Sequence, residues 1–172
     1  MRPQIVIHDV NILITLFKAQ LTSLPFAIEA DFLTTKLIFN DLSNSQQALY
    51  NSYVEAGSLA FAQAESLAIV NPQFTANRAL SIQDLSGLAL AEERGGLLLT
   101  EIKSVKLAAQ HVGLNTCGLL WVLDELVKLN KLTPRDAQEH IEQLLDVNCK
   151  LDQSECAAMA QHWLQTQPLH HL

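Results

Sequence analysis

The sequence predicts a single α/β domain in which a mainly parallel sheet is flanked by helices. Short apolar segments alternate along the chain with longer segments that have helical periodicity. The short segments are almost wholly apolar, which is typical of parallel strands buried on both faces. A chain of 172 residues can bury a full core, and we find no internal repeat, low-complexity stretch or linker.

Five short segments are predicted as strands because they are apolar or rich in β-branched residues and are bounded by turn signals. They cover residues 5–7, 31–35, 58–61, 97–99 and 114–117. Gly57 precedes the third strand and ends the helix before it. Pro72 marks a loop after that strand.

The intervening segments are predicted as helices from their apolar spacing and their end signals. They cover residues 11–20, 46–55, 81–95, 101–111, 119–129, 134–147 and 152–165, with a helical turn at 36–42. Ser81 with Asp84 three residues later is a variant of the capping box. Thr133 followed by Pro134 indicates an N-cap with proline at the first helical position. We expect residues 1–147 to form the main domain and residues 148–172 a helical extension packed on it.

The formal net charge of -7 argues against a protein that coats nucleic acid through charge alone, because such binding depends on neutralised phosphates. The charge is compatible with a nuclease. An acidic surface would also suit a basic protein partner. No segment reaches the roughly 20 apolar residues that a membrane span requires, and we identify no signal peptide. The expected location is therefore cytoplasmic, without membrane association.

Three cysteines, Cys117, Cys149 and Cys156, form no CxxC pair. The odd count and the spacing disfavour a disulfide framework or a zinc site, and favour thiols in a reducing compartment.

Four acidic residues, Asp9, Asp41, Asp84 and Glu101, lie close to the expected carboxyl ends of strands or in the first turns of helices. Ligands of open α/β sheets bind at this edge. Carboxylates gathered there could hold a hard divalent cation, which prefers oxygen ligands and can position a water for phosphodiester hydrolysis. Each residue also has a structural interpretation, as a helix cap or as a solvated surface acid. There is no GxGxxG motif or phosphate loop to favour a nucleotide-binding domain.

Several motifs resemble those of PIN domains. The hydrophobic strand Ile5-Val6-Ile7 followed by Asp9-Val10-Asn11-Ile12-Leu13-Ile14 resembles the opening of this family. The segments 80–91, 97–100 and 118–126 are similar to its central acidic helix, its next strand with a threonine, and the closing segment of one bacterial subgroup. The motifs are short, and their order and spacing extend the resemblance from about residue 5 to residue 145.

The resemblance implies a PIN-like three-layer α/β/α sandwich and a metal-dependent ribonuclease, often the VapC-like toxin of a toxin–antitoxin pair. It implies that Asp9, Asp84 and Asp41 hold Mg²⁺ or Mn²⁺, although the family more often has Glu at the Asp41 position. It further implies that Asn11 shapes the site and that Thr100 orients it. RNA would be the substrate and an antitoxin protein a partner.

One acidic position of the resembled site is displaced. The family has Thr-x-Asp after the fourth strand, whereas this chain has Thr100-Glu101-Ile102, and isoleucine cannot bind a metal. Glu101 lies one residue early, which on a helix turns its side chain by about 100°. Two interpretations follow: a ribonuclease with a weakened site, in which Glu101 contributes, or a catalytically impaired PIN-fold protein that binds a protein or RNA partner. The C-terminal helices, at 134–147 and 153–165, are expected to support a homodimer or antitoxin docking.

Overall fold

A five-stranded parallel sheet lies at the centre of the computed structural model, which describes residues 1–65, 71–148 and 150–166. Its strands are β1 (Gln4–Ile7), β2 (Asp31–Thr34), β3 (Leu59–Phe61), β4 (Leu97–Leu99) and β5 (Thr116–Cys117). They are arranged in the order β3-β2-β1-β4-β5, and every pairing is parallel. β2 and β3 thus lie on one side of β1, and β4 and β5, which follow later in the chain, lie on the other side. The resulting topological switch point lies at the carboxyl ends of β1 and β4.

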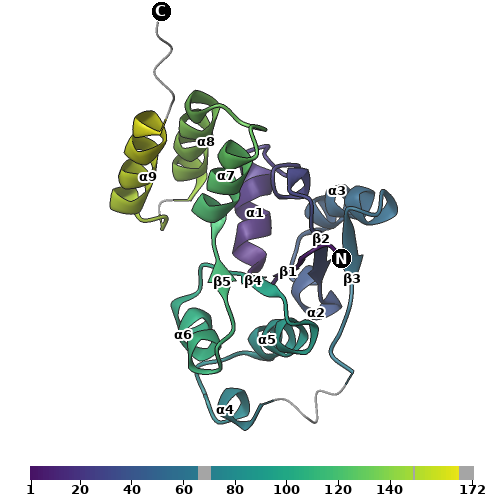
Figure 1. The fold of residues 1–172 in the computed structure, drawn as a ribbon. Coiled ribbons are helices and arrows are strands. Elements are labelled where there is room, and N and C mark those ends of the chain that lie inside the picture. Colours follow the sequence, from purple (N-terminus) through teal and green to yellow (C-terminus); the bar gives the residue numbers. More distant parts are fainter. Residues whose placement is uncertain (66–70, 149, 167–172) are drawn as a thin grey trace, which may run out of the picture. The chain divides into compact units, whose positions relative to one another are not determined.

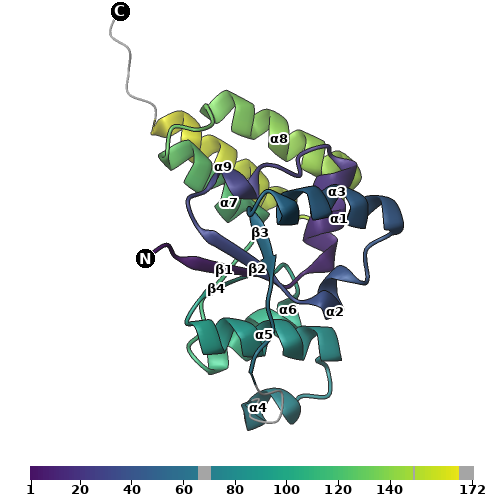
Figure 2. The same ribbon diagram turned by 90° about the vertical axis from the view of Figure 1, so that its right-hand side faces the viewer.

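The strands lie between helices on both faces of the sheet, which confirms the predicted α/β/α sandwich. α5 (Ile82–Arg94) and α6 (Lys103–His111) cover one face, and α3 (Asn44–Glu55) lies on the other (Figure 1, Figure 2). Val6 and Leu98 from the strands are fully buried and pack in one core cluster with Leu88 from α5 and Val105 from α6. This burial on both faces explains why the strands are almost wholly apolar in sequence.

The predicted helix ends agree closely with the structure where a capping signal is present. Ser81 caps α5 in a complete capping box with Asp84, and Gly95 ends that helix in the left-handed conformation, with φ of 59°. One prediction was wrong, because Pro72 does not lie in a loop but begins the short helix α4 (Pro72–Thr75). Proline suits a first helical position because its missing N–H has no partner there, and the Asn71 side chain accepts the N–H of Gln73. The short helix α2 (Lys36–Phe39) follows β2.

The chain divides into two compact units. The first comprises Met1–Ile14 and Glu29–Leu119 and contains the whole described sheet; the second comprises Thr15–Ile28 and Leu120–Leu172. Two helices, α1 (Val10–Lys18) and α7 (Leu119–Lys128), begin in the first unit and continue into the second. The predicted boundary at residue 147 stays a prediction.

The second unit is helical in its described part. It contains the short 3-10 helix η1 (Pro25–Ala27), α8 (Pro134–Val147) and α9 (Gln153–Gln165). Trp163 of α9 is 1% exposed, and its indole N–H donates to Asp124 Oδ1 of α7 at 3.0 Å. Cys117 and Cys156 are buried, and Cys149 lies outside the described residues. Among the helices that are described, none has the length and apolar character needed to cross a membrane.

Candidate functional site

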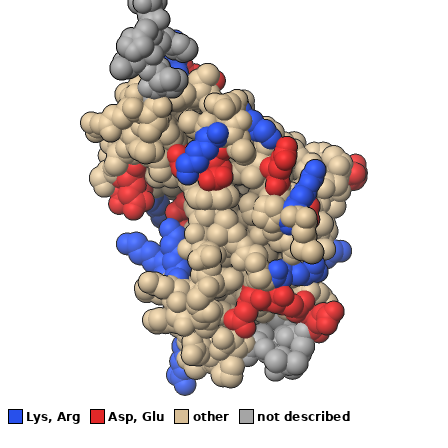
Figure 3. Space-filling model, viewed as in Figure 1, with Lys and Arg blue, Asp and Glu red and all other residues tan. Residues whose placement is uncertain are grey.

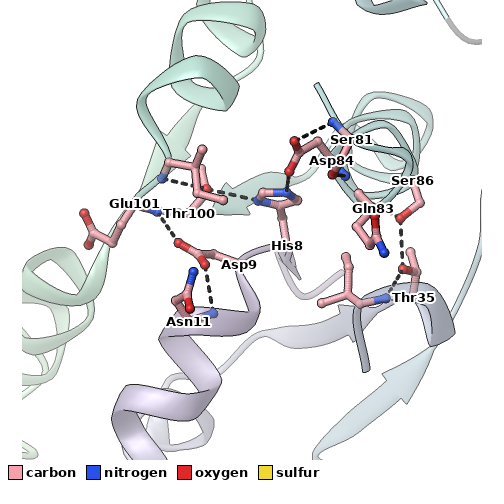
Figure 4. Close-up of polar contacts among 12 residues, drawn as sticks. His8, Asp9, Asn11, Thr35, Ser81, Gln83, Asp84, Ser86, Thr100 and Glu101 are labelled. Carbon is pink, nitrogen blue, oxygen red and sulfur yellow. Dashed lines mark hydrogen bonds and ion pairs between the residues drawn. The ribbon is translucent and has the colours of Figure 1, made fainter. Parts of the chain in front are cut away.

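The topological switch point brings together residues that are far apart in the sequence. His8 and Asp9 directly follow β1, and Thr100 and Glu101 directly follow the neighbouring strand β4. Asp84 reaches the same region from the first turn of α5 (Figure 4). The elements that carry Asp9, Asp84 and Glu101 thus meet at this edge, whereas the expected metal site of Asp9, Asp41, Asp84 and Glu101 stays a prediction.

Asp9 is 1% exposed and both of its carboxylate oxygens accept backbone N–H groups. Oδ1 accepts from Asn11 in the first turn of α1 at 2.9 Å, and Oδ2 accepts from Glu101 at 3.0 Å. Asp9 thus joins the start of α1 to the segment that follows β4. Asn11 contributes its backbone N–H to this arrangement, and the residue is otherwise exposed.

Asp84 is also bonded through both oxygens. Its Oδ2 accepts the backbone N–H of Ser81 at 2.8 Å, and its Oδ1 lies 2.7 Å from Nε2 of His8. Burial raises the pKa of Asp84, but the hydrogen bonds from His8 and Ser81 and the charge of His8 outweigh it, so the pKa lies below its usual value. Asp84 is therefore ionised at neutral pH, and an ionised carboxylate can only accept hydrogen bonds. Nε2 of His8 must then be the donor.

His8 is a residue of this region that the sequence analysis missed. Its side chain is buried, and its ring lies between Asp84 and Thr100, with Nδ1 3.0 Å from Thr100 Oγ1 (Figure 4). Gly87 on α5 leaves the space that the ring fills, because a Cβ there would lie 2.9 Å from His8 Cδ2. A signal was present in the sequence: a histidine at the end of a strand buried on both faces requires polar partners for its ring.

Glu101 points away from Asp9 in Figure 4, and its carboxylate has structural partners. Its Oε1 accepts the backbone N–H of Leu119, at the start of α7, at 2.8 Å. Its Oε2 lies 3.3 Å from Nζ of Lys106 in α6. Gly118 gives the carboxylate room, since a Cβ at that position would lie 2.0 Å from Oε1. Glu101 is thus placed to stabilise the start of α7.

Ile102, at the position where the resembled motif has an acid, packs its side chain against the core cluster that contains Val6 and Leu98. Its backbone N–H donates to Thr100 Oγ1 at 3.2 Å. Thr100 is fully buried, and its hydroxyl contacts both the ring of His8 and the backbone N–H of Ile102. Asp41 follows α2 and is exposed.

The donor set does not fit a divalent cation. Over residues 1–65, 71–148 and 150–166, no group of three or more His, Cys, Asp or Glu side chains is arranged to hold a metal ion. All four carboxylate oxygens of Asp9 and Asp84 already accept N–H groups of the protein. Their hydrogen-bonded arrangement joins secondary-structure elements to one another, and no chemical step through a metal follows from it.

The fold and this edge define the class of the protein: an α/β/α sandwich with acidic residues at the switch point of a parallel sheet. A sequence model of the PIN domain matches residues 5–165, so the chain belongs to the PIN-domain family. No curated protein matches the chain. Membership suggests nuclease activity in general, with divalent-metal dependence and RNA as the bound molecule. The VapC-like subgroup stays a prediction.

Proposed function

We propose that this PIN-domain protein acts by binding a protein partner and does not cleave RNA with the help of a divalent cation. The observation that carries the proposal is the engagement of Asp9 and Asp84, whose carboxylate oxygens are all hydrogen-bonded within the protein. A cation would have to compete with these N–H groups in a region where Ile102 supplies no ligand. Mg²⁺ is usually bound through one or two carboxylates together with several waters, and each N–H that a carboxylate oxygen accepts reduces the charge and the lone pairs that it can offer the cation.

Charge supports a protein partner over RNA. The chain carries a net charge of -7, and affinity for RNA depends strongly on cationic contacts to phosphates. On the face shown in Figure 3, Lys and Arg side chains of the described residues are scattered among acidic ones and form no continuous basic stripe. An acidic surface instead favours a basic protein through charge complementarity.

The second unit offers a surface for a protein partner, with both signs of charge in its lining. A groove of about 660 Å³ is lined there by residues of α7, α8 and α9, among them Lys128, Pro134 and Trp163. Leu129 and Leu164, which adjoin lining residues in the sequence, are 47% and 60% exposed. These two are the large apolar side chains that are exposed in the described part of the second unit, so they are the positions at which contacts with a partner can be tested.

The catalytic half of the proposal is tested by assaying RNA cleavage in Mn²⁺ and by titrating the protein calorimetrically with Mn²⁺. The matched control is Asp9→Asn, which removes the acid after β1. We expect no saturable Mn²⁺ binding and no cleavage above the level of the control. Cleavage by the natural protein that disappears in Asp9→Asn would contradict the proposal.

The proposed binding of a protein partner is tested with a small basic protein encoded by a neighbouring gene. We expect it to copurify with this chain and to be lost in a Leu129→Asp/Leu164→Asp variant. Leu107→Asp is the matched control because Leu107 is a 57% exposed leucine of α6 in the first unit. Equal loss in the control would argue against an interface on the second unit. Light scattering of the chain alone separates a homodimer from a complex with a different protein.

A second candidate function is a metal-dependent endoribonuclease with a weakened site, which family membership favours. In this case the protein would be the toxin of a toxin–antitoxin pair, Mg²⁺ or Mn²⁺ would be the cofactor, and the basic neighbour would be its antitoxin. Asp9, Asp84 and Asp41 would hold the metal, with Glu101, Asn11 and Thr100 contributing to the site. The cleavage assay above decides between the two functions. The cytoplasmic location stays a prediction that cell fractionation tests.

A further inference from the structure

The His8 ring lies between polar residues of two elements that meet at the switch point. The ring lies between the carboxylate of Asp84 on α5 and the hydroxyl of Thr100 after β4 (Figure 4). These are elements whose polar residues would have to converge at the switch point to enclose a metal. His8 instead links them directly, through one contact at each ring nitrogen.

Burial and close packing hold the His8 ring in this position. His8 is 3% exposed, so its ring cannot turn toward solvent without leaving the core. The backbone of Gly87 lies against the ring and restricts it on the side of α5. Thr100 is itself held, because its Oγ1 also accepts the N–H of Ile102 at 3.2 Å. Breaking such a buried, fully bonded network leaves polar groups without partners, which is costly.

The donor that His8 supplies is of the right kind to replace a cation. An ionised carboxylate requires positive charge or N–H donors around it, and Nε2 of His8 provides a donor 2.7 Å from Oδ1. Nε2 carries a proton in two forms of the ring. One is the neutral form in which Nδ1 accepts from the Thr100 hydroxyl, and the other is the protonated form in which both nitrogens donate. Asp84 is thus satisfied by the protein itself, together with the N–H of Ser81.

We propose that the His8 side chain occupies the structural place of a divalent cation, joining α5 to β4 and blocking metal binding at Asp84. This inference rests on the proposed loss of metal-dependent cleavage and names the residue responsible. Ile102 stands where the resembled motif has a carboxylate ligand. Independently of this, His8 is hydrogen-bonded to the carboxylate of Asp84. Two separate features therefore oppose metal binding, and reversing both should restore more Mn²⁺ affinity than reversing either one.

The inference is tested by Mn²⁺ binding to the full chain, followed by the electron paramagnetic resonance signal of the free ion. Four proteins are compared: the natural chain, Ile102→Asp, His8→Val, and the double variant His8→Val/Ile102→Asp. Valine suits the end of a strand and leaves a smaller void than alanine would. Aspartate suits residue 102 because it is the N-cap of α6, where the present isoleucine makes no side-chain cap.

We expect saturable Mn²⁺ binding in the double variant, about tenfold or more tighter than in either single variant, which is the scale on which partners of metal-ligating carboxylates act. Adding Asp84→Asn to the double variant should abolish this binding. Mn²⁺ should also raise the unfolding temperature of the double variant relative to EDTA, because a ligand that binds the folded state stabilises it. The natural chain should show no such shift.

Equal Mn²⁺ affinity in Ile102→Asp and in the double variant would overturn the inference, since His8 would then be no obstacle. Absence of binding in a double variant with a native circular dichroism spectrum would overturn it as well. If His8→Val does not fold, His8→Asn gives the same comparison with a polar side chain of smaller reach. Failure of the proposed function is distinguishable, because it would appear as RNA cleavage by the natural chain.

Discussion

The carboxylate of Glu101 lies at the start of α7, where its Oε1 accepts the backbone N–H of Leu119 at 2.8 Å. The first N–H groups of a helix have no partner within the helix, so a carboxylate there is favourable for hydrogen bonding and for the helix dipole. This gives the residue a structural role that can be measured separately from any role in metal binding.

Glu101→Ala is expected to lower the free energy of unfolding by about 1 kcal/mol, the usual cost of losing a side-chain cap. Urea denaturation followed by circular dichroism measures this change. Glu142→Ala is the control, because Glu142 is an exposed glutamate of α8 and its loss should change stability by less than about 0.5 kcal/mol. Similar values for the two variants would show that the Leu119 contact contributes nothing.

Gly118→Ala is expected to destabilise the protein through Glu101. A Cβ at residue 118 would lie 2.0 Å from Oε1 and 2.7 Å from Cδ of Glu101, so the carboxylate must move away from Leu119. In a Glu101→Ala background this conflict is absent, and Gly118→Ala should cost clearly less. A double-mutant cycle in urea measures the coupling. Additive effects would show that the backbone, and not Glu101, requires glycine at this position.

Gly87→Ala is expected to destabilise the natural chain and to stabilise a variant that lacks the His8 side chain. In the natural chain the new Cβ would lie 2.9 to 3.2 Å from three atoms of His8, and such overpacking costs about 1–3 kcal/mol. In a His8→Gly background all three of these atoms are absent, so the conflict disappears. The better helix propensity of alanine should then stabilise α5 by about 1 kcal/mol. Thermal and urea unfolding of the four proteins measure this, and destabilisation in both backgrounds would contradict it.

Asp124 is expected to make the stability of the second unit depend on pH. Burial raises the pKa of Asp124, but the hydrogen bonds from Lys128 and Trp163 and the charges of Lys128 and His162 outweigh it and lower the pKa below its usual value. A carboxyl with a lower pKa in the folded state stabilises the protein above its unfolded pKa. That contribution is lost as the pH falls through the folded pKa, which lies below the ordinary pKa of an aspartate.

The corresponding measurement compares the natural chain with Asp124→Asn by urea unfolding, followed by tryptophan fluorescence, from neutral to acidic pH. The difference in the free energy of unfolding should be constant near neutral pH and should shrink below about pH 4. A difference that does not change with pH would show that the charge of Asp124 does not contribute. Asp136→Asn provides a comparison at an exposed aspartate of α8.

Much of the fold was predictable because its signals are local. The apolar strands, the Ser81–Asp84 capping box and the proline after Thr133 all lie where the sequence patterns indicate. Pro72 was misinterpreted because proline is compatible with a loop and with a first helical position, and sequence alone does not separate the two. The order of the strands also followed only in part, since alternation indicates parallel pairing but not which strands are neighbours.

By itself the sequence determined the class of fold, the edge at which Asp9, Asp84 and Glu101 lie, and the absence of an acid at Ile102. Only the tertiary structure decided what those residues contact. The pairing of β1 with β4 brings His8 to Thr100, 92 residues away, and the packing of α5 on β1 brings it to Asp84, 76 residues away. Hydrogen bonds depend on distances of a few tenths of an ångström, and those distances are set by the packing of segments that are remote in the chain.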